Sequence, residues 1–163
     1  MNAKYVIRNN LEMSEFIVNS YLGDLDDADL MIRPVEGMNH IAWQIGHLVT
    51  SERMFIEGLK PGSCPPLPAG FAELYTKEGS NVDDRSKFRS KAEYLDLWKA
   101  QREATRAVLD GIPESTLDEP GPEKFREFAP TVGSILSMIG THTLMHVGQW
   151  VGVRRKLKKP ISI

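Results

Sequence analysis

Two histidines, His142 and His146, stand four residues apart inside the stretch from Thr131 to Leu157, which has the apolar periodicity of one long helix. A spacing of four places both imidazoles on one side of a helix, with their Cβ atoms roughly 6 Å apart. Two imidazoles in this arrangement can bind one metal ion. The alternative is a pair of core histidines that are each satisfied by hydrogen bonds. Two bare imidazoles side by side in a core are costly, and a shared cation removes that cost.

Both histidines lie in the middle of the face that this helix is expected to bury. At helical spacing, the buried stripe consists of Ile135, Ile139, His142, His146, Trp150, Val153 and Leu157. The two imidazoles therefore stand where hydrophobic side chains would otherwise point into the interior of the fold.

A third histidine, His47, lies in the middle of another apolar stretch, for which we expect a helix from Asn39, as its N-cap, to about Leu59. Considered alone, His47 fits a core or boundary histidine satisfied by hydrogen bonds. Because His142 and His146 also stand at mid-helix, three imidazoles at similar depth can converge on one ion. Three neutral imidazoles leave coordination positions open, which is typical of a reactive metal site. Imidazole ligands suit zinc, nickel, iron or copper and do not choose among them.

His40 is seven residues before His47, at nearly the same azimuth but roughly 10 Å nearer the start of the helix. That separation is too great for both side chains to bind the same ion. His40 is the remaining candidate for a catalytic proton carrier. The alternative is a surface or capping residue in the first helical turn.

Two further amphipathic stretches complete the elements that must position these histidines. One runs from about Ala3 to Leu22, where Gly23 is expected to end the helix in the left-handed conformation. The other runs from Ser90, which forms a capping box with Glu93, to about Ile112. We expect the opposite face of this last stretch to be solvated; it carries Lys99, Arg102, Glu103 and Arg106.

Four helices of roughly 20 residues, with no competing strand pattern, predict an all-α fold: an antiparallel four-helix bundle with long connecting loops. The chain of 163 residues is expected to form a single domain, 1–163. Residues 60–89 are irregular and rich in proline, with a short helix predicted at about 69–77, and should pack across the bundle. Cys64 has no neighbouring base, so a packed or solvent-exposed thiol is favoured over a nucleophile or ligand.

Net charge, cysteine content and the length of apolar runs indicate which binding partners and which cellular location to expect. A formal net charge of −2 gives no reason to expect a nucleic acid or an anionic membrane, and we read the basic cluster at 154–159 as a solvated helix end. The single cysteine rules out an internal disulfide and suits a reducing compartment. Because neither a signal peptide nor a run of 18 apolar residues is evident, we expect a cytoplasmic location.

Two motifs resemble those of one family. The stretch from Asn39 to Leu48, followed by Ser51-Glu52-Arg53, resembles the second helix of the DinB/YfiT-like superfamily. The segment from His142 to Gln149 resembles the signature of its last helix, two histidines four apart followed by Gly-Gln. Chain length and layout match over essentially the whole sequence. The resemblance implies a four-helix bundle that is usually a homodimer, with a divalent metal on His47, His142 and His146.

The resemblance also implies a class of reaction. Characterised members include metal-dependent transferases and isomerases that use a low-molecular-weight thiol, such as bacillithiol or mycothiol. The first hypothesis is therefore a thiol S-transferase or related detoxification enzyme, in which the cation lowers the thiol pKa and holds the nucleophile toward a small-molecule electrophile. Val147 departs from the family, where many members carry Arg or another polar residue, and this weakens any carry-over of substrate contacts.

Two alternatives stay open. In a metal-dependent hydrolase, a metal-bound water would need a base, but no Asp or Glu adjoins the histidine pair, and Glu52 lies about 140° from His47 around the helix. The other alternative is a metal-binding stress-response protein without turnover, or a bundle whose partner is another protein. Arg154 could face the pocket mouth and pair with a substrate carboxylate. Gln149 could orient a ligand or pack between helices.

Overall fold

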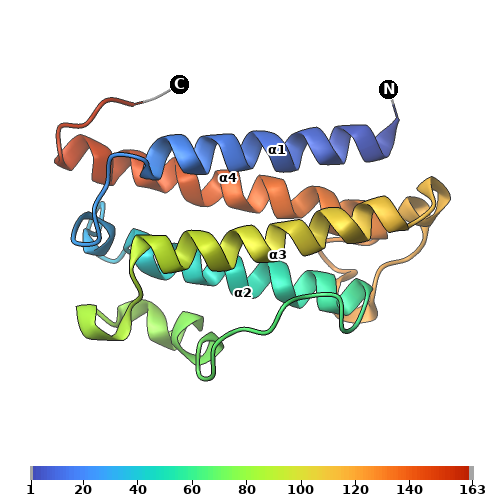
Figure 1. Ribbon diagram of the computed structural model, residues 1–163, viewed down its shortest axis with the longest axis horizontal. Helices are drawn as coiled ribbons and strands as arrows, with labels where there is room; N and C mark the ends of the chain where they lie inside the picture. Colours follow the sequence, from blue (N-terminus) through green and yellow to red (C-terminus); the bar gives the residue numbers. More distant parts are fainter. Residues whose placement is uncertain (1, 162–163) are drawn as a thin grey trace.

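The structure, a computed structural model, describes residues 2–161, and this part of the chain folds into a bundle of four long helices without a β-strand (Figure 1). The long helices are α1 (Ala3–Leu22), α2 (Ile41–Leu59), α3 (Lys91–Gly111) and α4 (Val132–Lys156). Short 3₁₀ helices interrupt the connections: η1 (Asp29–Met31), η2 (Ala72–Tyr75), η3 (Glu78–Asn81), η4 (Arg85–Lys87), η5 (Glu114–Asp118) and η6 (Glu123–Phe125). The predicted all-α bundle is confirmed.

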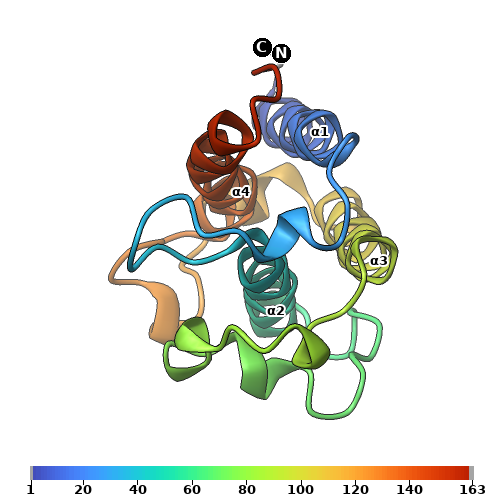
Figure 2. The same cartoon turned by 90° about the vertical axis from the view of Figure 1, so that its left-hand side faces the viewer.

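The helices form two parallel pairs, α1 with α4 and α2 with α3, and the two pairs run antiparallel to each other. In Figure 1, α1 and α4 run in one direction, and α2 and α3 run in the other. Figure 2, which looks along the bundle, shows the order α1, α4, α2, α3 around the axis, so that α2 and α4 are neighbours. Because the chain must return along the length of α2 before α3 begins, residues 60–90 form a long crossing segment against α2.

Side-chain caps explain where the helices begin. The Ser90–Glu93 capping box of α3 is present as predicted, and Thr131 caps α4 by the same kind of exchange with Ser134. Two predicted helix ends were wrong. His40, not Asn39, caps α2 through its ring, and Gly23 ends α1 with φ −53° in the right-handed region.

Apolar side chains of the described residues pack into two clusters, one toward each end of the bundle. One cluster is centred on residues such as Trp43, Tyr94 and Trp150, and the other on residues such as Leu11 and Ile135. On every long helix, a buried polar residue stands in sequence between the members of the two clusters: Ser14, Glu52, Arg102 and Thr143. A polar layer therefore crosses the middle of the bundle.

Arg102 is the centre of this layer, and the prediction that it lies on a solvated face was wrong. Its side chain is fully buried and forms a two-point ion pair with Glu52, with Nε–Oε1 2.9 Å and Nη2–Oε2 3.1 Å. The guanidinium also donates to Ser14 and to Thr143, so that all four long helices in the described chain contribute to one network. Helical periodicity predicts that a charged residue on the polar face is exposed. Arg102 is buried instead because its ion pair with Glu52 offsets the desolvation of the guanidinium.

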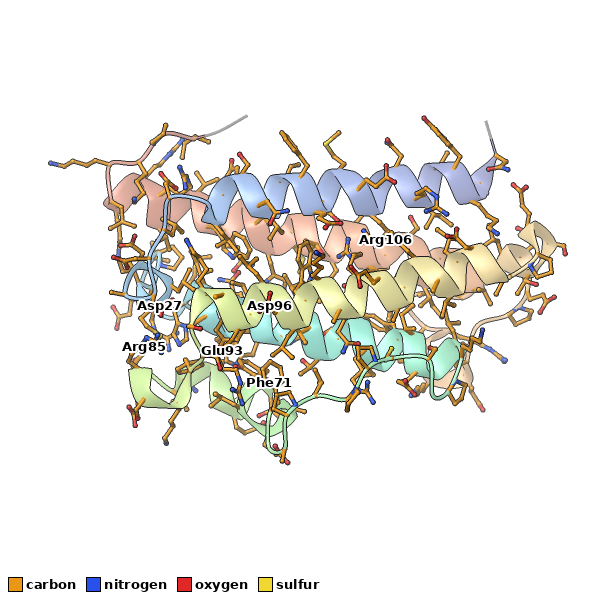
Figure 3. The ribbon with its side chains drawn as sticks, viewed as in Figure 1. Asp27, Phe71, Arg85, Glu93, Asp96 and Arg106 are labelled. Carbon is orange, nitrogen blue, oxygen red and sulfur yellow. The ribbon has the colours of Figure 1, made fainter. Side chains whose placement is uncertain are left out.

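The crossing segment is packed, as predicted, rather than a linker. Its aromatic residues Phe71, Tyr75 and Phe88 are buried, and the hydroxyls of Tyr75 and Tyr94 lie 2.6 Å apart. Figure 3 shows Arg85 of this segment beside Asp27 of the α1–α2 connection, where the two side chains form an ion pair of 3.1 Å. The predicted short helix at 69–77 is shorter, spanning only the η2 residues.

Among the residues that the structure describes, no helix combines the length and the apolar character that crossing a lipid bilayer requires.

Candidate metal centre

The structure brings His47, His142 and His146 together where α2 passes α4. One ring nitrogen from each residue lies within 4.8 Å of the other two, and among residues 2–161 these side chains form the only such group of three or more potential ligands. The ring centroids are 4.8–5.3 Å apart. His146 is buried, whereas His47 and His142 are partly exposed, so the cluster lies at the edge of the interior.

Gln44 and Trp150 fix the orientation of His146. The Trp150 indole N–H, which can only donate, bonds to Gln44 Oε1 at 2.9 Å, and the Gln44 amide nitrogen donates to the Asn39 carbonyl at 2.6 Å. Gln44 Oε1 is therefore an acceptor, and His146 Nδ1, at 3.1 Å from it, must donate. The proton of His146 thus resides on Nδ1, and the lone pair of Nε2 faces the cluster. Metal-bound histidines use the same kind of support.

The residues fit a divalent cation. His146 Nε2 and His142 Nε2 are 3.1 Å apart. Because His146 Nε2 presents a lone pair, the short distance between these nitrogens can be explained in two ways. Either His142 donates a proton across the gap, or a cation accepts both lone pairs. Zinc–nitrogen bonds of 2.0–2.1 Å in tetrahedral geometry separate ligand nitrogens by roughly 3.4 Å, close to the separation seen here. The predicted role of the three histidines as metal ligands stays a prediction.

The crossing segment and α2 position His47. Its ring stacks on Trp43, with centroids 4.9 Å apart and planes within 7° of parallel. The imidazole hydrogen-bonds to the backbone of Tyr75, and Ser51 Oγ lies 3.5 Å from its Nε2. Gly46 allows the Tyr75 ring to pack directly against α2, because a Cβ on Gly46 would lie only 2.1 Å from an atom of that ring.

Burial keeps the cluster uncharged. Desolvation, followed by the proximity of the neighbouring histidines, lowers the pKa of His146 to about 3 and that of His142 to about 4. Desolvation also lowers the pKa of His47, against the opposing effect of its hydrogen bond to the Tyr75 backbone. At neutral pH each of these imidazoles therefore carries one N–H and one lone pair, and the lone pair is what metal binding requires.

His40 does not have the free nitrogen that a proton carrier needs. It is fully buried, Nδ1 accepts the Trp43 N–H at 3.1 Å, and Nε2 donates to the Val82 carbonyl at 3.0 Å. Of the two predicted roles, the structure supports the capping one. His40 therefore joins the start of α2 to the crossing segment.

Other candidate residues are engaged away from the cluster. Arg154 is buried and pairs with Asp24 and with the Tyr21 carbonyl, so the prediction that it faces a pocket mouth was wrong. Its guanidinium lowers the pKa of the Asp24 carboxyl. Gln149 is half-buried, and its role stays a prediction. Burial and the nearby Glu57 raise the pKa of the Cys64 thiol to about 11, in keeping with a packed thiol.

Sequence reasoning missed Gln44 as a supporting residue. Its signal was a single amide inside the apolar run from Ile41 to Ile45, three residues before His47. A buried amide in such a run needs a partner for each of its polar ends. The partners, Trp150 and Asn39, were identifiable only once α2 and α4 were placed side by side.

Comparisons with known proteins bear on the fold and on the family. No curated protein matches the chain. Among solved structures, the crystal structure of a conserved protein from Enterococcus faecalis is similar, with a TM-score of 0.74 at 18% sequence identity. The match covers 98% of this chain and 99% of that one and supports the fold. A family model described as the DinB superfamily matches residues 11–150, and the chain therefore belongs to the DinB superfamily.

Proposed function

We propose that this protein binds one divalent transition-metal ion on His47, His142 and His146 and uses it to transfer a low-molecular-weight thiol to a small-molecule electrophile. The observation that carries the metal site is the convergence of three uncharged imidazoles, one of them held in the Nδ1–H tautomer by Gln44. Three nitrogen ligands leave coordination positions for a reactant. When bound, such a cation lowers the pKa of a coordinated thiol or water.

The protein's own residues then have separate tasks. Gln44 and Trp150 hold His146, and Trp43 holds the ring of His47. The half-buried His142 borders a surface groove, through which a reactant reaches the cluster. In the transfer, the thiol sulfur forms a bond to the electrophilic carbon, the leaving group departs with the electron pair of its own bond, and the thiol proton passes to solvent.

The hydrolase alternative lacks a free base. Glu52 borders the small interior space beside His142, but Arg102 binds both of its carboxylate oxygens, and Thr105 donates to Oε1 at 2.6 Å. A carboxylate engaged in this way cannot accept a proton from a nucleophilic water without breaking a buried ion pair. The engagement of Glu52 by Arg102 and Thr105 favours the transferase over the hydrolase.

The test is conjugation of a thiol to a model electrophile, 1-chloro-2,4-dinitrobenzene, by protein loaded with zinc, nickel or iron(II). Bacillithiol and mycothiol are assayed separately. We expect one of these combinations to exceed the uncatalysed rate, His146→Ala to abolish the acceleration, and His40→Asn, a histidine variant outside the cluster, to keep it. Equal rates for wild type and His146→Ala would refute the transferase. Metal binding without turnover on any of these substrates would favour the non-catalytic metal-binding protein.

A further inference from the structure

A groove of about 420 Å³ opens between α2 and α4 beside the histidine cluster. Phe55, Met138, Thr141, His142 and Met145 line it. His142 thus belongs both to the cluster and to the wall of the groove, so a molecule lying there is next to one of the three candidate metal ligands. The volume falls within the range of small-molecule sites.

The wall of this groove offers little to a charged ligand. None of its lining residues is an aspartate, glutamate, lysine or arginine. The hydroxyl of Thr141 donates to the Met138 carbonyl of its own helix at 3.1 Å, and His142 Nε2 faces His146. An anion placed against Phe55, Met138 and Met145 would lose its hydration without gaining a hydrogen-bond or ion-pair partner from these side chains.

The same wall suits an apolar or aromatic group. Thioethers of Met138 and Met145 and the ring of Phe55 are polarizable surfaces that contact aromatic rings favourably. The aromatic surface continues outward, because Phe55 packs on Phe128, with ring centroids 6.2 Å apart, and Phe128 is 56% exposed. Met145 is 57% exposed and forms part of the opposite edge.

A second groove, between α2 and the crossing segment, has the opposite character. Its lining includes Arg53, Glu57 and Glu73, and it contains none of the cluster histidines. The groove that reaches His142 is therefore the apolar one, and the charged one lies apart from the cluster.

From this contrast we infer that the groove lined by Phe55, Met138 and Met145 binds the uncharged aryl or alkyl portion of the electrophile. That the bound molecule is an electrophile rests on the proposed function. The binding of a neutral apolar molecule in the groove does not depend on turnover. The protein would accordingly select neutral aryl and alkyl substrates over their carboxylated or sulfonated analogues.

Binding is tested with the neutral fluorophore N-phenyl-1-naphthylamine and metal-free protein. Met145→Glu places a charge at the edge of the groove on an exposed side chain, so the fold is expected to persist, as circular dichroism would verify. The matched control is Met13→Glu, an exposed methionine on α1 that does not line the groove. We expect Met145→Glu to weaken binding by at least about tenfold and Met13→Glu to leave it unchanged.

Equal affinities for wild type and Met145→Glu would overturn the inference. So would dissociation of a wild-type dimer by Met145→Glu but not by Met13→Glu in sedimentation, because the groove would then be a subunit interface. With an active metal-loaded protein, Met145→Glu should raise KM for a neutral aryl electrophile about tenfold while kcat changes little. If the fluorophore binds and responds to the variant but no electrophile is turned over, the proposed transferase fails and the apolar site stands.

Discussion

The middle of the bundle contains two polar clusters that differ in whether all their hydrogen-bonding and charged groups have partners within the protein. In the Arg102 network, a buried cation meets a buried carboxylate, and neighbouring hydroxyls take up the remaining positions. In the histidine cluster, two Nε2 atoms face each other at 3.1 Å, and one of them presents a lone pair. The first cluster is complete without a ligand, whereas the second gains partners when a cation is added. This difference separates a polar group that supports the fold from one that can act on another molecule.

The largest expected effect comes from breaking the complete cluster. Glu52→Ala leaves the Arg102 guanidinium buried and unpaired, and we expect it to lower the free energy of unfolding by about 3–5 kcal/mol in urea titrations of metal-free protein. The double variant Glu52→Leu/Arg102→Met should recover part of this loss, because no buried charge remains.

The control is Arg106, which pairs with Glu15 on the outer surface between α3 and α1 (Figure 3). Arg106→Ala should cost about 0–1 kcal/mol, because both side chains of this half-buried pair still reach solvent. A loss for Glu52→Ala no greater than that for Arg106→Ala would show that the Arg102 network does not support the fold.

The next largest effect is a loss of folding stability in acid that arises from the histidine cluster. His142 and His146 have folded pKa values of about 4 and about 3, below the 6.5 of an unfolded histidine. The unfolded chain therefore binds more protons as pH falls below 6.5, and stability is lost from that pH downward. Metal-free protein should lose on the order of 2 kcal/mol between pH 6.5 and 5.

Carboxylates do not account for a loss in this window. The capping-box bond of Glu93 lowers its pKa to about 2 from 4.5, so its contribution is lost only below about pH 4.5. His142→Leu/His146→Leu should reduce the slope between pH 6.5 and 5. The smaller part that remains is due to His40 and His47, because burial lowers the pKa of these two histidines as well. An unchanged slope in this variant would show that the clustered histidines are not held uncharged.

Removing the support of His146 should weaken metal binding without touching a ligand. Gln44→Leu deletes the acceptor of the Nδ1 proton, and we expect about 10–100-fold weaker zinc binding by competition with a chelator. Gln44→Glu keeps an acceptor toward both His146 and Trp150 and should retain most of the affinity. Nitrogen-15 spectra should show His146 as the Nδ1–H tautomer in wild type but not in Gln44→Leu. A zinc affinity of Gln44→Leu equal to that of wild type would show that Gln44 does not support the metal site.

The smallest effect is expected at His40. His40→Ala removes the side-chain cap of α2 and should cost about 1 kcal/mol of stability, whereas His40→Asn, a good capping residue, should cost less. Neither variant should change zinc affinity. A loss of affinity in both would give His40 a part in the site that its hydrogen bonds do not indicate.

Much of the fold could be predicted because its signals are local. The Ser90–Glu93 box, the apolar stripes and the prolines of the crossing segment depend on residues near one another in sequence, and α1, α3 and α4 begin within a residue or two of the predicted positions. The same helical phase placed His142 and His146 on one face, where the structure has them.

The features that sequence reasoning missed depend on neighbours distant in the chain. Arg102 reads as exposed unless Glu52 is known to lie opposite, 50 residues earlier. Arg154 likewise has its partner, Asp24, 130 residues away. His40 takes the capping position from Asn39 because Val82, on the crossing segment, accepts the proton of its other ring nitrogen. Helical periodicity contains no information on which helices are neighbours.

The number of metal ions bound per chain tests the proposed metal centre most directly. Isothermal titration of metal-free protein with zinc, with metal content measured after dialysis, should give one ion per chain for wild type and none retained for His47→Leu, His142→Leu or His146→Leu. His40→Asn should bind as wild type does. Zinc retained equally by wild type and the three cluster variants, or no divalent ion retained by wild type, would contradict the claim that these imidazoles form a metal centre.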